Sequence, residues 1–171
     1  LWTSFSPDIT QVSQQPDYQQ DSLTLFFASP TADDVDKLWI DQDVFINDNY
    51  AINPWTIGVA TFDGLDETGY PHDWSASGAT GWADDLTSKP IDLSSYSIGD
   101  SVYISFFYQA GGLGNAPESD DSLVLEFYLP STASWRSFWG INGFTSDEWY
   151  YEHLILDDPI YFQNGFQFRF R

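Results

Sequence analysis

The sequence contains no cysteine and no methionine, and only five of its 171 residues are lysine or arginine. Without cysteine the chain has no disulfide framework and no thiolate metal site, whichever compartment it occupies. No window approaches the run of about twenty apolar residues that a membrane-spanning helix needs. The first residues lack a signal-peptide pattern and Leu1 is not an initiator methionine, so we expect a fragment of a longer product.

The shortage of basic residues leaves a formal net charge of −21 at pH 7, because 26 residues are aspartate or glutamate. A surface of this sign repels phosphate backbones and anionic lipid, which argues against nucleic acid and membrane surfaces as partners. The same carboxylates suit divalent cations. For any single aspartate, the simpler interpretation is a solvated loop residue that keeps the protein soluble.

Aromatic side chains are abundant, at 19 % of the residues, in a chain long enough for about one domain with a single core. Many of them fall in runs where side chains alternate in character, which is typical of strands. No stretch shows a helical period beyond a turn near residues 145–148. We therefore predict an all-β fold, an antiparallel β-sandwich of about eight strands in two sheets.

The stretch from Ser101 to Leu129 contains two long alternating runs, SVYISFFYQ and DSLVLEFYL, joined by the segment AGGLGNAPESDD. We predict that the two runs pair as neighbouring strands, with Leu123, Leu125, Phe127 and Leu129 on one face of the second strand, which we expect to point inward. Their connection is too long for a tight hairpin turn, and long structured loops in compact domains are usually functional.

Further strand-like runs extend this prediction along the chain. They are residues 22–28, two short strands within 32–49, 56–62, the segment 85–94 that Pro90 interrupts, 134–141, 148–156 and 166–171. Strict alternation would put Trp135 and Trp139 on the same face of their strand. Residues 1–21 are rich in Gln, Ser, Pro and Asp and predict an arm or linker, which leaves residues 22–171 as the domain.

In the last predicted strand Phe166, Phe168 and Phe170 face inward, whereas Gln167, Arg169 and Arg171 face outward. The strand stops at Arg171 without a flanking polar tail. We expect the domain to continue beyond it, so that the fragment is truncated before its last strand. The fragment would then leave an open sheet edge at its C-terminal strand, which a strand of another chain could extend. A missing tail with nothing docked there is an equally good interpretation.

The order of certain features along the chain is distinctive. They are the run Ala60-Thr61-Phe62-Asp63-Gly64, the pair Asp73-Trp74, then Trp135, Trp139 and Trp149, and the closing FQFRFR. This order resembles the MAM and laminin-G-like jelly-roll domains. A domain of large Bacteroidetes cell-surface proteins, associated with gliding motility and type IX secretion, is similar in sequence to two segments, VFINDNYAINPWTIGVATFDG and SKPIDLSSYSIGDSVYISFFYQ. The resemblance covers residues 35–171 and implies jelly-roll topology and an extracellular or cell-surface location.

Imidazole bases are limited to His72 and His153, and no GxSxG segment presents a serine nucleophile. His153 lies on an alternating strand face, where a histidine is more often structural than catalytic. Glycoside hydrolysis needs two carboxylates about 5–10 Å apart, which Glu126, Glu148 and Glu152 could in principle supply. The E-x-D-x-x-E spacing of jelly-roll glycosidases is absent, so we do not expect an enzyme.

A structural calcium ion is a better candidate, because calcium takes about six to eight oxygen ligands from carboxylates, carbonyls and water. Asp63, Asp66 and Asp73 fall in one loop after a strand, and the resemblance to MAM-type domains points at Asp63 and Asp73. The same loop also contains Glu67. A second acidic cluster, in the long central connection, comprises Glu118, Asp120 and Asp121.

Aromatic residues near the same loop are candidates for ligand binding. They are Trp55, Tyr70, Trp74 and Trp82. Exposed rings beside carboxylates are how lectin-like β-sandwich modules stack on sugar rings. The alternative is that these rings cap the ends of the sandwich, and we favour that alternative.

These observations favour a non-catalytic extracellular module for adhesion or assembly within a larger protein, with a protein or glycan at the cell surface as its partner. Two alternatives stay open. One is a carbohydrate-binding module of a polysaccharide-utilising system, and the other is a subunit docked on secretion or motility machinery. A hydrolase ranks last.

Overall fold

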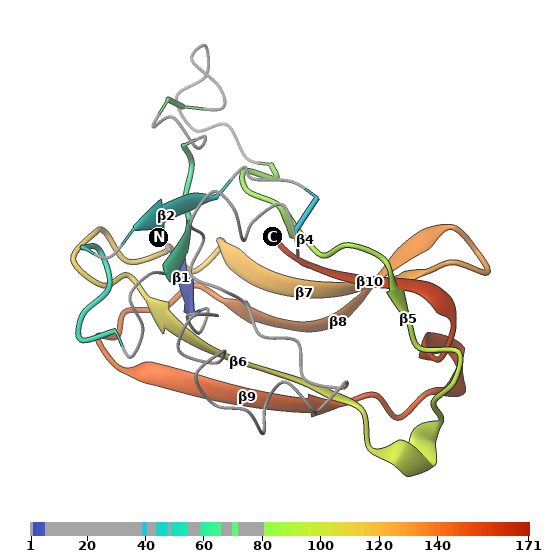
Figure 1. Ribbon diagram of the computed structural model, residues 1–171. Helices are drawn as coiled ribbons and strands as arrows, with labels where there is room; N and C mark the ends of the chain where they lie inside the picture. The colour runs from blue at the N-terminus through green and yellow to red at the C-terminus, as the bar shows by residue number, and fades with distance from the viewer. Residues whose placement is uncertain are drawn as a thin grey trace.

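The structure is a computed structural model that describes residues 2–5, 39–40, 44–47, 49–54, 59–65, 70–71 and 81–171 (Figure 1). These residues form ten strands and two short 3-10 turns, η1 (Ile98–Asp100) and η2 (Pro159–Tyr161), with no α-helix among them. All pairings between strands are antiparallel, and they define two sheets. The predicted all-β, antiparallel, two-sheet character is confirmed. In the described part of the chain, no helix is long and apolar enough to cross a membrane.

The first sheet has the order β2-β3-β1-β6-β9. Its strands are β1 (Trp2–Phe5), β2 (Phe45–Asn47), β3 (Val59–Phe62), β6 (Tyr103–Ala110) and β9 (Trp149–Ile155). Strand β1 comes from the segment predicted to be an arm or linker, and it pairs with both β3 and β6. Of residues 1–21 the structure describes only these four, while the predicted strand at 22–28 lies outside the described residues.

The second sheet has the order β4-β10-β7-β8, and a further strand, β5, also pairs with β10. Its strands are β4 (Leu86–Thr87), β5 (Ile91–Asp92), β7 (Ser122–Leu129), β8 (Ser134–Asn142) and β10 (Asn164–Phe170). The two-residue strands β4 and β5 lie on either side of Pro90, as expected for a residue that cannot donate a backbone hydrogen bond to a neighbouring strand. Short tight turns then join β7 to β8, through Thr132 and Ala133, which donate to Leu129 and Pro130.

The two long runs of the central stretch do not pair with each other, so that prediction was wrong. Strand β6 pairs with β9 over seven residues, whereas β7 pairs with β8 on one side and with β10 on the other. The segment 111–121 therefore carries the chain from one sheet to the other. Close approach of other backbone to this segment requires glycine at two positions: a Cβ on Gly112, within the segment, would overlap the carbonyl oxygen of Tyr50, and one on Gly143, after β8, would overlap the backbone of Glu118.

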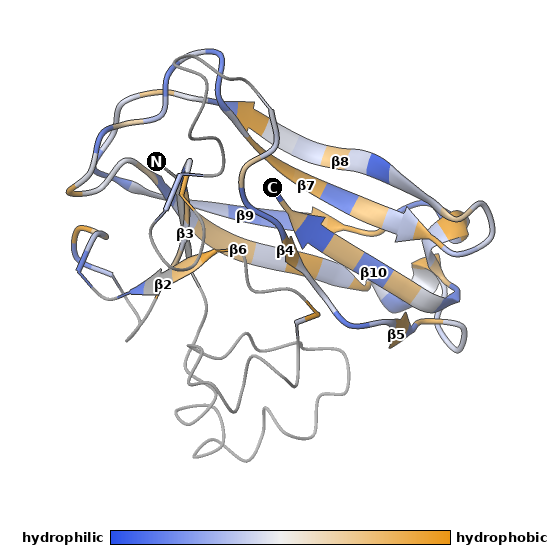
Figure 2. Cartoon of the chain, turned by 90° about the horizontal axis from the view of Figure 1, so that it is seen from above, coloured by the Kyte–Doolittle hydropathy of each residue, from blue (hydrophilic) through white to orange (hydrophobic). Residues whose placement is uncertain are grey.

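One core is shared by residues of both sheets. The β6 ring of Phe106 lies 5.1 Å from the β8 ring of Trp139 and 4.8 Å from the β10 ring of Phe170, in edge-to-face geometry. On β7 the predicted inward residues Leu123, Leu125, Phe127 and Leu129 are fully buried, and alternation of buried and half-buried residues is also found along β10. Figure 2 shows β10 as alternating orange and blue bands. Each fully buried side chain of this size contributes about 1.5–3 kcal/mol.

A β-bulge changes the faces of β8. The pairing shifts between Leu125 and Glu126, which face Trp139 and Ser137, so that Phe138 is the extra residue. Trp139 consequently packs in the core against Tyr108, at 5.3 Å, whereas Trp135 lies on the outer face. The predicted common face for the two tryptophans was therefore wrong, because strict alternation does not pass through a bulge.

The C-terminal strand is not an open edge. On one side β10 pairs with β7, and on the other side with β4 and β5. The backbone of Arg171 also exchanges two hydrogen bonds with that of Val124, of 2.8 and 3.0 Å. The strand addition that we expected at this position therefore has no free edge to use. Among the described strands, β8 and β9 each lie at an end of their sheet.

A buried amide joins the loop 49–54 to the first sheet. Gln109 is fully buried, and its Oε1 accepts a hydrogen bond of 2.9 Å from the amide of Ile52. Its Nε2 donates to the carbonyl oxygens of Ile52 and Asp147, at 3.2 and 2.7 Å. The indole nitrogen of Trp149 donates to the same Ile52 carbonyl at 2.8 Å. Loop and sheet therefore share a hydrogen-bonded network, and these four hydrogen bonds between described residues involve no charged side chain.

Candidate functional site

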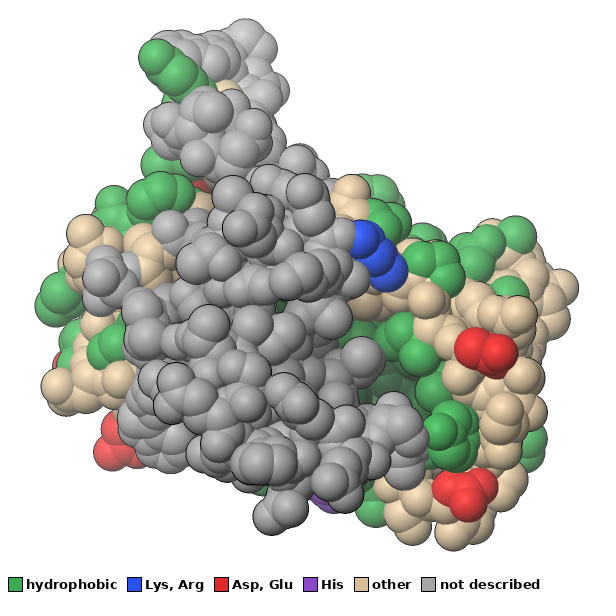
Figure 3. Space-filling view, in the orientation of Figure 1, with side chains coloured by type: hydrophobic (Ala, Val, Ile, Leu, Met, Phe, Trp, Pro, Cys, Tyr) green, Lys and Arg blue, Asp and Glu red, His purple; other side chains and the backbone are tan. Residues whose placement is uncertain are grey.

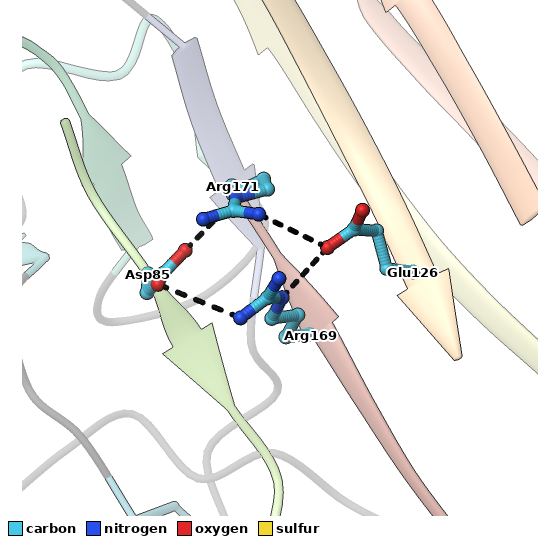
Figure 4. Close-up of polar contacts among 4 residues, drawn as sticks. All are labelled: Asp85, Glu126, Arg169 and Arg171. Carbon is cyan, nitrogen blue, oxygen red and sulfur yellow. Dashed lines mark hydrogen bonds and ion pairs between the residues drawn. The ribbon is translucent and has the colours of Figure 1, made fainter. Parts of the chain in front are cut away.

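Four charged side chains meet on the outer face of the second sheet (Figure 4). Arg169 and Arg171 come from β10 and its end, Glu126 from β7, and Asp85 directly precedes β4. The register explains the meeting, because Arg169 pairs with Glu126 on one side and with Thr87 on the other. The three segments that supply these four residues are separated by up to 86 positions in the sequence (171 minus 85).

The four side chains form a closed ring of ion pairs. Glu126 Oε2 accepts from Arg169 Nε at 2.7 Å and from an Arg171 terminal nitrogen at 3.3 Å. Asp85 faces Arg171 Nε at 3.2 Å and an Arg169 terminal nitrogen at 3.8 Å. The arginine side chains are only 16 % and 8 % exposed, so water screens these pairs weakly. The ring connects β4, β10 and β7 with no net charge.

Two tryptophans lie against the guanidinium groups of this ring. Arg171 is 3.6 Å from the ring centroid of Trp82, and Arg169 is 4.3 Å from that of Trp135. Both distances are within the range of cation–π contacts. Trp135 also contacts Tyr128, its cross-strand partner on β7, at 5.3 Å. We call this surface the arginine face; it comprises Asp85, Glu126, Arg169, Arg171, Trp82 and Trp135.

Trp82 is a ligand-binding candidate from the sequence, and its exposure is unusual. Its side chain remains 81 % exposed although Arg171 lies against the ring. Tyr70, another candidate, is 56 % exposed. Trp55 and Trp74 lie outside the described residues. Sequence reasoning missed the arginines beneath the tryptophans; the alternation in FQFRFR placed both arginines on an outer face but gave no indication of their partners.

The predicted metal ligands are placed in part. The Asp63 carboxylate accepts a hydrogen bond of 2.7 Å from the amide of Leu65, and the amide of Asp63 donates to the buried carboxylate of Asp84, which sequence reasoning missed. Asp66 and Asp73 lie outside the described residues, as does Glu67.

The second acidic cluster is exposed. Asp121 accepts a hydrogen bond of 2.8 Å from the amide of Glu118, a local turn contact, and Asp120 lies beside it on the surface. Over the residues that the structure describes, no three His, Asp or Glu side chains converge as a metal site would require. On the face shown in Figure 3, the acidic side chains drawn in red lie apart from one another.

The candidate acid–base residues are separated. His72 lies outside the described residues, and His153 is exposed on β9 with its ring 4.3 Å from that of Tyr103. Glu126 is bound to the two arginines. Glu152 is on the inner face of β9, near Tyr108. The burial of Tyr108 is the largest cause that raises its pKa to about 12, and the negative charge of Glu152 is the next.

A second exposed surface lies on the outer face of β6 and β9. The register pairs Phe107 with Tyr151 and Ser105 with His153. Ring centroids are 4.7 Å apart for Phe107 and Tyr151, 6.5 Å for Tyr151 and His153, and 4.3 Å for His153 and Tyr103. We call Tyr103, Phe107, Tyr151 and His153 the outer aromatic row. Sequence alternation could indicate which residues of each strand share a face, but not that these two strands are neighbours.

A scan of protein-family models gave no match, and searches of curated proteins and of solved structures found no similar protein.

Proposed function

We propose that this protein is a non-catalytic binding module, a β-sandwich of jelly-roll type that serves adhesion or assembly outside the cell or at its surface. Two antiparallel sheets with a common core of aromatic rings support this architecture. The resemblance of residues 35–171 to MAM-like domains of Bacteroidetes surface proteins supports the location. Assembly with secretion or motility machinery would be one case of the same binding function.

The proposal depends mainly on the exposure of Trp82, whose side chain is 81 % exposed although its ring lies on the guanidinium group of Arg171. A large ring whose position is already restricted in this way loses little further conformational entropy when a partner binds. Tryptophan and arginine are also the residues most enriched among those that dominate the binding energy of protein interfaces. The arginine face therefore suits a protein partner.

The groups that hydrolysis would need have other neighbours. Glu126 neutralises two arginines, and His153 contacts aromatic rings rather than a described carboxylate. A structural calcium ion also belongs to this proposal, at the loop that follows β3 and begins with Asp63. This calcium site is supported by the acidic composition of that loop and by the preference of calcium for carboxylate and carbonyl oxygens.

The test is capture of cell-surface proteins on the immobilised chain. We expect the native chain to retain a partner that Trp82→Ala does not retain, because truncation of a central interface tryptophan weakens binding by about 2 kcal/mol or more. Tyr151→Ala, which removes an exposed ring from the other surface, is the matched control and should retain the partner. Equal retention by the Trp82→Ala chain would exclude the arginine face as the binding site.

A second candidate function is carbohydrate binding, which the outer aromatic row favours. Its rings lie side by side on two paired strands, and Tyr103 and Tyr151 are 46 % and 53 % exposed. Ligand sites are typically lined by aromatic side chains with a few polar groups that fix orientation, and the row has this composition.

A further inference from the structure

We propose that the outer aromatic row binds a neutral, extended polysaccharide chain, an inference that rests on the second candidate function. The row follows two strands that stay paired over seven residues, so its rings have a fixed order along the strands: Tyr103, then His153, then the directly paired Tyr151 and Phe107. Consecutive centroids are 4.3 to 6.5 Å apart. Tyr103 and His153, and likewise Phe107 and Tyr151, are partly stacked on one another with a tilt of 40°, so the row is an elongated surface of two ring pairs that an extended ligand could follow.

The chemistry of the row suits sugar rings. The C–H groups on one face of a pyranose are slightly positive and stack on the negative face of an aromatic ring, as other positive edges do. The Tyr103 and Tyr151 hydroxyls, the His153 ring nitrogens and the neighbouring Ser105 hydroxyl can donate to or accept from sugar hydroxyls. Ile155, which pairs with Tyr103 and is 50 % exposed, extends the apolar surface at one end.

Charge selects a neutral polymer. The outer positions of the paired stretch of β6 and β9 are Tyr103, Ser105, Phe107, Gln109, Trp149, Tyr151, His153 and Ile155, and none is Asp, Glu, Lys or Arg. The whole chain carries a formal charge of −21, so a polyanion such as a uronic acid polymer is repelled. A polycation would find no carboxylate at these positions with which to pair.

The size of the surface argues against a second copy of the chain as the occupant. Tyr103, Tyr151 and the adjacent Ile155 are about half exposed, and at about 150–250 Å² per side chain the three together offer roughly 225–375 Å². A stable protein interface buries about 800 Å² on each partner.

Addition of a strand to β9 is also disfavoured. Glu152 points inward from this edge strand, and inward-pointing charged residues on an edge strand discourage pairing with another strand.

The experiment is affinity electrophoresis and pull-down of the whole chain on neutral polysaccharides (cellulose, xylan, mannan and mixed-linkage β-glucan), with alginate as the anionic comparison. We expect retention by at least one neutral polymer and none by alginate. Tyr103→Ala and Tyr151→Ala should each weaken binding about three- to tenfold, the range for loss of one aromatic stacking contact. Tyr151→Phe keeps the ring and should stay within about twofold. Trp82→Ala, on the arginine face, should bind as the native chain does.

Each outcome has a defined meaning. If a neutral polysaccharide binds but the tyrosine variants and the native chain bind it equally, the carbohydrate-binding function stands and the outer aromatic row is not its site. If none of the neutral polymers binds, both the row and the second candidate function are wrong, while the arginine face is unaffected. Stronger binding to alginate, or a native dimer that Tyr151→Ala dissociates in sedimentation, would also overturn the proposal. Unchanged thermal melting of Tyr103→Ala, Tyr151→Ala and Tyr151→Phe shows that the comparison is between folded proteins.

Discussion

The ion-pair ring of the arginine face predicts a large effect for a nearly isosteric substitution, Glu126→Gln. The change removes one charge and leaves two guanidinium groups with Asp85 as their only remaining partner in the ring. Loss of one partner destabilises a buried pair by about 3–5 kcal/mol, and an exposed pair by at most about 1 kcal/mol. Glu126 and Arg169 are each 16 % exposed, so we expect a loss of about 2–3 kcal/mol in the free energy of unfolding.

The assay is equilibrium urea unfolding, followed by tryptophan fluorescence. With a slope of about 1–3 kcal/mol per molar urea, the predicted loss lowers the midpoint by roughly 0.7–3 M. A double-mutant cycle with Arg169→Gln should give a coupling energy of about 1 kcal/mol or more. The exposed Glu148→Gln is the control and should change stability by no more than about 0.5 kcal/mol. An effect of Glu126→Gln no larger than this control, or a coupling energy near zero, would refute the reasoning.

Four further perturbations test other parts of the structure. Gly143→Ala should destabilise by more than about 2 kcal/mol because its Cβ would overlap the Glu118 backbone, whereas Gly140→Ala, whose Cβ finds nothing nearer than 3.5 Å, should be nearly neutral; similar urea midpoints for the two would contradict the packing. Gln109→Leu removes three hydrogen bonds and should lower stability by about 2–4 kcal/mol, with faster amide exchange at Ile52; unchanged exchange there would show that the buried amide does not fix the loop. The pKa of Tyr108 is raised from 10.0 to about 12, so the stability that it contributes is complete below about pH 10 and is lost as the pH rises towards 12; Tyr108→Phe should flatten that decline in urea unfolding, and an identical decline would argue against the burial effect. Millimolar calcium should raise the melting temperature and EDTA should lower it, and a melting curve indifferent to both would argue against a structural calcium ion.

Local alternation in the sequence identified most of the described strands. The runs that became β6, β7, β9 and β10 were recognised within one or two residues, and the predicted inward side chains of β7 and β10 are buried. This success has a simple cause: a strand that buries one face must alternate, whatever strand lies beside it. The bulge at Phe138 marks the limit, because one extra residue exchanges the two faces without leaving a clear signal in composition.

What the amino-acid sequence determined by itself was therefore the strand character, the apolar faces and the scarcity of positive charge. Tertiary structure alone decided that β6 pairs with β9 rather than β7, and that Asp85, Glu126, Arg169 and Arg171 meet. The same long-range pairing creates the outer aromatic row, since Tyr103 and His153 are fifty positions apart in the sequence (153 minus 103). Any two alternating strands can form equivalent backbone hydrogen bonds, so the choice of neighbour depends on the packing of the whole core, which no local pattern encodes.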